Sequence, residues 1–147
     1  MENKTLSLLE VGKMMHAVYR VFKKRFELQI QEEVKISIEQ FGLLHAISKE
    51  SEEVIQKDMA EMMGKDKSAI LRLIDSLEEK ELVRRVVDTK DRRKNYLMVT
   101  KTGNRVLEQY MKIFYDLVQE LQAGLDQSEI DTFHKVTAQI KTIAEKL

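Results

Sequence analysis

The chain has 147 residues, of which 34% are charged and 6% aromatic, and its 25 basic and 25 acidic side chains give a formal net charge of zero. It contains neither cysteine nor proline. Disulfides, thiolate metal sites and cysteine redox sensing are therefore excluded, and long unbroken helices are permitted. These values are typical of one helix-rich soluble domain, or of one domain with helical extensions.

The N-terminal sequence MENKTLSLLE lacks a basic region followed by an apolar stretch, so it is not expected to be a signal peptide. No segment approaches the roughly 18 apolar residues of a membrane-spanning helix. We therefore expect a cytoplasmic protein without a membrane partner.

The first third of the chain shows two helical patterns. Apolar residues recur at steps of three and four over residues 5–28, which predicts an amphipathic helix. Ser37 and Gln40 have the spacing of a capping box at the start of a second helix. Val54 and Ile55 follow a polar turn and are compatible with a very short strand.

Residues 56–83, QKDMAEMMGKDKSAILRLIDSLEEKELV, divide at Gly64 into two helical patterns. Small Ala60 lets a second helix cross closely, and Gly64 suits a left-handed turn. Asp66 is placed to cap the second helix. The apolar side of that helix carries Ile70, Leu73, Ile74 and Leu77. A short helix, a tight turn and a longer helix predict a helix-turn-helix.

The opposite face of this second helix changes character along its length. It carries Lys65, Ser68, Ala69 and Arg72, followed by Asp75, Ser76 and Glu79. The first half is small and basic, whereas the second half is acidic. This gradient fits a recognition helix that enters the major groove of DNA with its N-terminal residues.

Residues 83–87 and 95–100 are expected to form the two strands of a hairpin, with DTKDRRK at its tip. A tight turn forms readily with uncharged residues, so the fold does not explain the basic ones. Crowded like charges are tolerable where the partner is a polyanion, and arginine on a narrow protrusion suits the minor groove. Asp91 is expected to orient an arginine through a bidentate pair.

The last third predicts two more helices. Thr100 is placed to cap a helix that reaches about Ala123, and Gly124 ends it. Asp126 and Glu129 form a second capping box before a final helix. That helix carries an apolar stripe, which usually requires a partner surface.

The hairpin sequence VVDTKDRRKNYLMVTKTG resembles the wing signature of the MarR family of bacterial winged-helix transcription regulators. The matching positions are Asp88, Asp91, Arg92, Arg93, Leu97, Thr100 and Gly103. The preceding DKSAILRLIDSLEEKELV resembles the family's recognition helix, and the likeness covers roughly residues 35–105. Two positions depart from the pattern: Glu81 stands where the family often has glycine, and Val87 where it often has proline.

The resemblance implies a mainly α fold with a small β-hairpin wing, in a single MarR-like domain over residues 1–147. Residues 35–103 would be the winged helix-turn-helix lobe, and residues 1–34 and 104–147 a helical dimerisation region. The family pattern implies a homodimer on a pseudo-palindromic double-stranded DNA operator. It also implies a repressor released by a small aromatic or phenolic effector.

The candidate DNA-binding residues come from the second helix and the wing. They are Lys65, Lys67, Ser68, Ala69, Arg72, Lys90, Asp91, Arg92, Arg93 and Lys94. The alternative is ordinary solvated surface charge. Arg85 matches a common arginine of the family and has a structural role as its simplest explanation.

An effector pocket is expected between the dimer base and the DNA lobe. Its candidate residues are Met15, His16, Tyr19, Phe41, His45, Tyr110 and Phe114. The same residues could equally pack the hinge between the lobes. The three histidines are scattered over separate helices, so no metal site or cofactor is predicted.

No catalytic residue is predicted. Asp88 and Asp91 lie on an exposed turn, where no desolvation shifts a pKa for acid-base work. GKDKS lacks the first glycine and the preceding strand of a phosphate loop. The alternatives to a specific regulator are a winged helix that binds protein and a non-specific DNA-binding protein without ligand response. The steepness of salt dependence distinguishes protein binding from binding to DNA phosphates.

Overall fold

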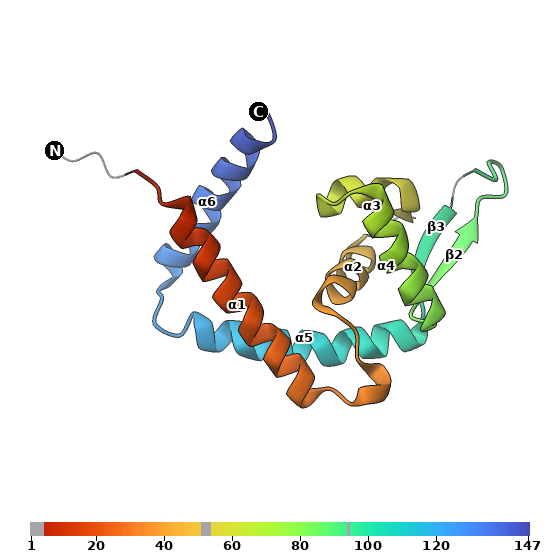
Figure 1. Cartoon of the computed structure of the whole chain (residues 1–147), viewed down its shortest axis with the longest axis horizontal. Helices are drawn as coiled ribbons and strands as arrows, with labels where there is room; N and C mark the ends of the chain where they lie inside the picture. Colours follow the sequence, from red (N-terminus) through yellow and green to blue (C-terminus); the bar gives the residue numbers. More distant parts are fainter. Residues whose placement is uncertain (1–4, 51–53, 94) are drawn as a thin grey trace. The chain divides into compact units, whose positions relative to one another are not determined.

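The computed structural model describes residues 5–50, 54–93 and 95–147. The chain forms two compact units, Met1–Phe114 and Tyr115–Leu147. The elements are α1 (Leu8–Gln29), the 3₁₀ turn η1 (Glu32–Val34), α2 (Ile38–Lys49), β1 (Val54–Ile55), α3 (Gln56–Met63), α4 (Lys67–Glu79), β2 (Val83–Val87), β3 (Asn95–Val99), α5 (Lys101–Leu121) and α6 (Gln127–Ala144) (Figure 1). The predicted mainly α fold with one β-hairpin is confirmed.

The helix starts follow the expected capping residues. At α2 the Ser37 side chain accepts the N–H of Gln40 at 3.0 Å, and the Gln40 side chain accepts the N–H of Ser37 at 2.7 Å. At α4 the Asp66 carboxylate accepts the N–H of Ala69 at 2.8 Å. Each bond satisfies an N–H that the first helical turn leaves without a partner. The short turn η1 was not predicted from the sequence.

The helix-turn-helix consists of α3 and α4. Gly64 sits between them with φ +62°, a conformation that glycine adopts without steric cost. Lys65 follows in the turn, and its N–H donates to the carbonyl of Ala60 at 3.1 Å. Lys65 therefore lies before α4 and not on the face of that helix. α4 buries Ile70, Ile74 and Leu77 and packs against α2 and α3.

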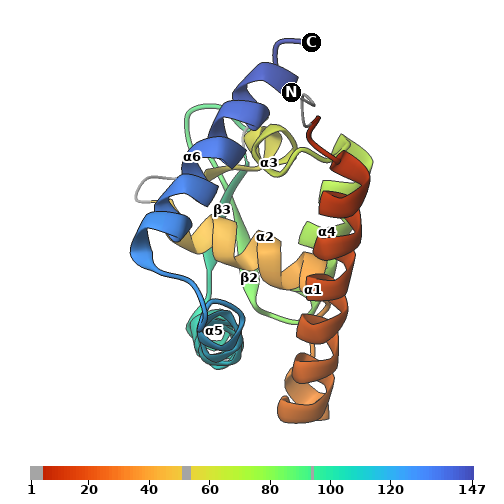
Figure 2. The ribbon, with the colours of Figure 1, turned by 90° about the vertical axis from the view of Figure 1, so that its left-hand side faces the viewer.

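The three strands form one antiparallel sheet in the order β1-β3-β2. β2 and β3 make the predicted hairpin, with Val83 opposite Val99 and Val87 opposite Asn95. The expected short strand β1 pairs with the other side of β3, so Val54 faces Leu97. Figure 2 shows α2 crossing in front of the hairpin strands, in agreement with the contact between α2 and β3.

Aromatic side chains from three helices form the centre of the first unit. Phe26 of α1 and Phe41 of α2 meet Tyr110 of α5, with ring centroids 4.7 and 5.7 Å from that of Tyr110. Tyr110 is 0% exposed. Close offset and edge contacts of this kind stabilise aromatic pairs beyond their buried area. The cluster anchors α1, α2 and the first part of α5 to one another.

The base of the hairpin is closed by a close contact between two backbone segments. The Thr100 hydroxyl donates to the carbonyl of Glu81 at 2.7 Å and accepts the N–H of Gly103 at 2.9 Å. A Cβ on Gly103 would lie 2.1 Å from the carbonyl oxygen of Leu82. The start of α5 can therefore approach the start of β2 only because residue 103 is glycine.

The second unit contains the end of α5 and all of α6. The predicted capping box is present, since Asp126 accepts the N–H of Glu129 at 2.8 Å and Glu129 accepts that of Asp126 at 2.9 Å. α6 exposes an apolar stripe of Phe133, Val136, Ile140 and Ile143. Among the described residues, the structure contains no helix with the length and apolar character needed to cross a membrane.

Glu81 occupies the left-handed region with φ 60°, where side chains other than glycine are strained by about 1 kcal/mol or more. We expect Glu81→Gly to raise the free energy of unfolding by up to about 1 kcal/mol. This value is net of the opposing effect that glycine loses more conformational entropy on folding. Chemical denaturation measures the change. Glu79→Gly, in right-handed helix, is the control and should destabilise the fold by a similar amount. Loss of stability in Glu81→Gly would contradict the strain.

Candidate nucleic-acid interface and ligand cavity

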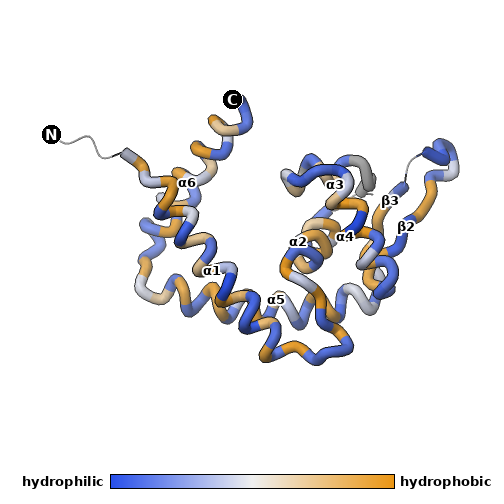
Figure 3. The backbone as a smooth tube through the Cα atoms, viewed as in Figure 1, coloured by the Kyte–Doolittle hydropathy of each residue, from blue (hydrophilic) through white to orange (hydrophobic). Residues whose placement is uncertain are grey.

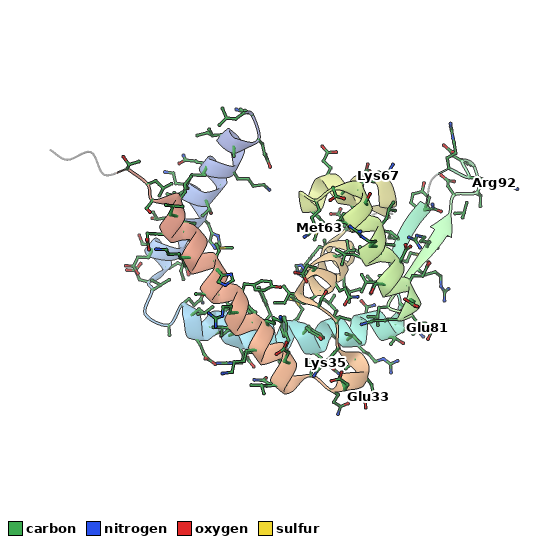
Figure 4. The ribbon with its side chains drawn as sticks, viewed as in Figure 1. Glu33, Lys35, Met63, Lys67, Glu81 and Arg92 are labelled. Carbon is green, nitrogen blue, oxygen red and sulfur yellow. The ribbon has the colours of Figure 1, made fainter. Side chains whose placement is uncertain are left out.

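The N-terminal half of α4 presents polar side chains to solvent. Lys67, Ser68 and Arg72 are exposed, and Ala69 is half-buried. Lys65 is also exposed, in the turn before the helix. Figure 4 shows Lys67 at the start of α4 and Arg92 at the tip of the hairpin. The described part of this surface offers cations and one hydroxyl, which suit phosphate oxygens and base edges.

The C-terminal half of α4 is engaged inside the protein. Ser76, expected on the outer face, instead accepts a hydrogen bond from the side-chain amide of Gln40 in α2. Asp75 pairs with Arg85 of β2. The far end of α4 thus contacts α2 and β2, and the predicted DNA-binding face is limited to its first turns.

Arg85 connects the first strand of the hairpin to α4. Its Nη1 lies 2.8 Å from Oε1 of Glu78, and its backbone N–H donates to Oε2 of the same residue at 3.2 Å. The Arg85 side chain is 22% exposed. The structural role expected for Arg85 is therefore present. Hydrogen bonds from one guanidinium to two carboxylates fix direction as well as distance.

The tip of the hairpin is held by its two aspartates. Asp88 accepts the N–H of Lys90 at 2.9 Å and the hydroxyl of Tyr96 at 2.8 Å. Asp91 accepts the N–H of Arg93 at 3.0 Å and its Nε–H at 3.1 Å. Figure 3 shows this tip as strongly hydrophilic. The pairing expected of Asp91 with an arginine is thus present in the free chain.

Arg93 remains available for a partner although it is paired. Its side chain is 91% exposed, whereas that of Asp91 is 30% exposed. The carboxylate therefore accepts from Nε and, at 3.5 Å, from Nη2 of the guanidinium group, while the side chain stays largely in solvent. Arg92 and Lys90 are exposed as well. Lys94, the last residue predicted for the wing, lies outside the described residues.

A cavity of about 290 Å³ lies within the first unit, where α1 passes the start of α2. Its walls come from α1, from the segment that enters α2, and from α5. They are Tyr19, Lys23, Phe26, Glu27, Lys35, Ile36, Ser37, Ile38, Glu39 and Tyr110. Apolar rings with a few polar groups are the usual lining of a small-molecule site.

The structure separates the predicted effector residues into three groups. Tyr19 and Tyr110 line the cavity. Phe41, His45 and Phe114 belong to the aromatic cluster, with the rings of His45 and Phe114 at 6.2 and 5.7 Å from that of Phe41. Met15 and His16 are exposed on α1 and do not line this cavity.

Polar groups in the cavity wall are already ordered by neighbours. The Tyr19 hydroxyl donates to Glu39 at 3.1 Å, and this bond raises the pKa of Tyr19. Burial raises the pKa of Tyr110, so its hydroxyl remains protonated and donates to the carbonyl of Ile36 at 3.1 Å. The same hydroxyl accepts the N–H of Ile36 at 2.7 Å. Tyr110 is therefore a structural residue as well as a wall of the cavity.

Lys23, Lys35 and Glu39 were not predicted as cavity residues. Lys23 is one more charged residue on an amphipathic helix, and its spacing gives no signal. Gln40 did carry a signal, because glutamine in a capping box keeps a free amide donor that glutamate lacks. Within the described ranges, His, Asp and Glu side chains form no group of three that could hold a metal ion.

The helix-turn-helix, the hairpin and the basic tip define a winged helix-turn-helix lobe. The MarR family model matches residues 35–94, the segment that contains the helix-turn-helix and the first strand of the hairpin. Over this segment, the chain is similar to the MarR family.

Sequence and structure comparisons agree with this assignment. The chain is 30% identical over 73 residues to the uncharacterised HTH-type transcriptional regulator YwaE of Bacillus subtilis, a match over 50% of this chain and 43% of that one. The chain therefore matches less than half of that relative's length. MepR of S. aureus, solved with DNA, has a TM-score of 0.78 at 21% identity, covering 98% of this chain and 100% of that one. BpsR of Bordetella bronchiseptica is a protein whose DNA binding is regulated by 6-hydroxynicotinic acid. Its structure has a TM-score of 0.71 at 20% identity, and the match covers 90% of this chain and 98% of that one.

Tyr110→Phe removes the hydroxyl that satisfies both backbone groups of Ile36. We expect the free energy of unfolding to fall by about 1–3 kcal/mol, because a buried N–H loses its acceptor. Tyr19→Phe removes an exposed hydroxyl and should change stability by less than about 0.5 kcal/mol. Denaturation of the two variants measures the difference, and equal small losses would contradict the structural role of Tyr110.

Proposed function

We propose that the chain is a sequence-specific double-stranded DNA-binding transcription regulator that acts as a homodimer. The observation that carries the proposal is the fixed, exposed Arg93 at the wing tip beside a recognition helix with a basic N-terminal half. A charge layout of this kind is suited to phosphates and grooves. The net charge of zero is compatible with it, because acidic residues lie elsewhere in the chain.

The first turns of α4 would enter the major groove. Arg72 has the fork geometry that pairs with the O6 and N7 atoms of guanine. Lys65 and Lys67 would contact phosphates, and Ser68 accepts or donates to either base edge or backbone. The small side chain of half-buried Ala69 would let the backbone of α4 approach the groove closely. The acidic end of α4, held by Arg85, would lie away from the phosphates.

The wing would reach the flanking minor groove. Lys90, Arg92 and Arg93, with Lys94, would supply the positive charge that a narrow minor groove attracts. Asp91 would hold Arg93 in the direction of entry. The short turn bonds of Asp88 would keep the tip stiff during the encounter.

The homodimer would form through residues 1–34 and 104–147. α1 exposes Leu8, Leu9 and Met15, and α6 exposes Phe133 and Ile143. Apolar side chains exposed along a helix in this way support an interaction site on each of the two helices. A two-fold dimer would place two identical lobes on a pseudo-palindromic operator, with half-sites about one helical turn apart.

The cavity would take a small aromatic or phenolic acid. Phe26 and the two tyrosines offer surface for a ring, and Lys23 and Lys35 offer cations for a carboxylate. Such a ligand would release the operator, which makes the protein a repressor. The regulation of BpsR by an aromatic acid supports this class of ligand.

Selection of genomic DNA fragments on the purified protein, at two salt concentrations, tests the proposal. We expect a few fragments that share a pseudo-palindrome to be retained at both. Retention of all fragments at low salt and none at high salt would indicate a non-specific binder. Retention of none at either salt would favour a protein-binding winged helix and contradict the proposal.

Arg93→Ala removes the arginine that Asp91 holds at the wing tip. We expect operator affinity to fall by about tenfold or more, with a shallower dependence on salt, because a groove cation and its released counterions are lost. Fluorescence anisotropy measures both quantities. Lys112→Ala in α5 removes an equal charge from an exposed position and should leave affinity nearly unchanged. Equal affinity in Arg93→Ala and wild type would exclude the wing contact.

Arg72→Ala tests the recognition helix separately. Loss of a bidentate contact with guanine costs about 1–3 kcal/mol of discrimination, so we expect relaxed preference at one base pair of each half-site. Binding to a library of single-base operator variants measures this preference. A footprint and preference identical to those of wild type would show that Arg72 does not read a base.

A further inference from the structure

Gln40 connects the start of α2 to the recognition helix. It is the buried polar residue of the described core, with 8% of its surface exposed. Its Oε1 accepts the N–H of Ser37, which leaves the amide NH₂ pointing the other way. That amide donates to the hydroxyl of Ser76 in α4. One side chain therefore caps α2 and holds α4.

Lys80 makes a second connection between the same two regions. It follows the last residue of α4, and its Nζ donates to the carbonyl of Lys35 at 2.9 Å. The two bonds, Gln40 to Ser76 and Lys80 to Lys35, fall one turn apart on α4. They attach the C-terminal half of α4 to the chain between Lys35 and Gln40, called here the 35–40 segment.

The 35–40 segment is also a wall of the cavity. Every residue from Lys35 to Glu39 lines it. The segment is held from the opposite direction by Tyr110, which binds both backbone groups of Ile36. The segment is therefore hydrogen-bonded to α5 and to the end of α4, and it lines the cavity. Both bonds to α4 originate from this segment, so the cavity wall and α4 are directly connected.

We propose that the 35–40 segment couples the cavity to the recognition helix, with Gln40 and Lys80 as the positioning residues. A small aromatic acid that fills the cavity displaces the segment, and the two bonds carry the displacement to α4. Coupling between sites requires an element that both sites bias, and this segment contacts both. The inference rests on the proposed function only for its effect on DNA.

The absence of cysteine from the chain provides a test that needs no knowledge of the natural ligand. Lys23→Cys places the sole thiol in the cavity wall, and benzyl methanethiosulfonate attaches a phenyl ring there. The thiolate forms a disulfide with the benzylthio group, and methanesulfinate leaves. Lys24→Cys is the matched control, because Lys24 is an exposed neighbour that does not line the cavity.

Two readouts are measured on the full chain with and without the label. Amide hydrogen exchange of residues 67–79 reports on α4 without DNA. Operator affinity reports on function. We expect the label on the Lys23→Cys variant to speed exchange in α4 and to weaken operator binding, each by about tenfold, within the usual range for coupled sites. The label on the Lys24→Cys variant should change neither by more than about twofold.

The same label is then placed at position 23 in an uncoupled background, in which Lys23→Cys is combined with Ser76→Ala and Lys80→Met. We expect faster exchange in α4 before labelling and a change of less than about twofold afterwards. If the background with both changes folds poorly, Lys80→Met alone replaces it, because this change alters an exposed side chain. Lys80→Met alone should reduce the effect of the label in part. The conservative variant Ser76→Thr retains the hydroxyl and should retain the effect.

Three results would decide the matter. An effect of the label that is undiminished in the uncoupled background would overturn the coupling. Equal exchange in α4 before and after labelling of the Lys23→Cys variant would overturn it as well. Changed exchange in a protein that selects no operator would retain the coupling and refute the DNA-binding function, so the two failures are distinguishable.

Discussion

The fork that Arg85 makes with Glu78 and Asp75 is the interaction on which the placement of the hairpin beside α4 depends. A hairpin joined to its neighbours only by a strand ladder could twist about its base. Because Arg85 belongs to β2 and both carboxylates belong to α4, the wing and the recognition helix share one frame. Arg85 is the half-buried member of the fork, whereas both carboxylates are exposed to solvent. The frame is therefore held by electrostatics at its edge and by apolar packing at its centre.

The opposite side of α4 is held by weaker contacts. The bond from Gln40 to Ser76 and the bond from Lys80 to a backbone carbonyl lie where α2 and the cavity wall meet. α4 is thus held by ion pairs on the side of the wing, and by these two hydrogen bonds together with apolar packing on the side of α2.

Periodicity, caps and turn chemistry predicted nearly all of the fold. The apolar spacing of α4, the capping pairs at Ser37 and Asp126 and the left-handed Gly64 are local signals, and local signals are readable from one chain. The prediction that Ser76 lies on the outer face of α4 was wrong, because its exposure was judged from helical spacing alone. Its partner Gln40 is 36 residues away, and no local pattern encodes that distance. Of the ten residues that line the cavity, only Tyr19 and Tyr110 were predicted, because Lys23 and Lys35 reach the same cavity through tertiary packing.

The pairing of Asp91 with Arg93 has a consequence for how tightly the wing can bind. A free arginine side chain loses up to about 2 kcal/mol of rotamer entropy when a partner immobilises it. Arg93 surrenders part of that freedom in the folded chain, so less is lost at the encounter. In the proposed complex with DNA, the aspartate would therefore contribute to affinity in spite of its charge. A wing with asparagine at this position would repel the phosphates less, yet it would have to organise its arginine anew each time it met a groove.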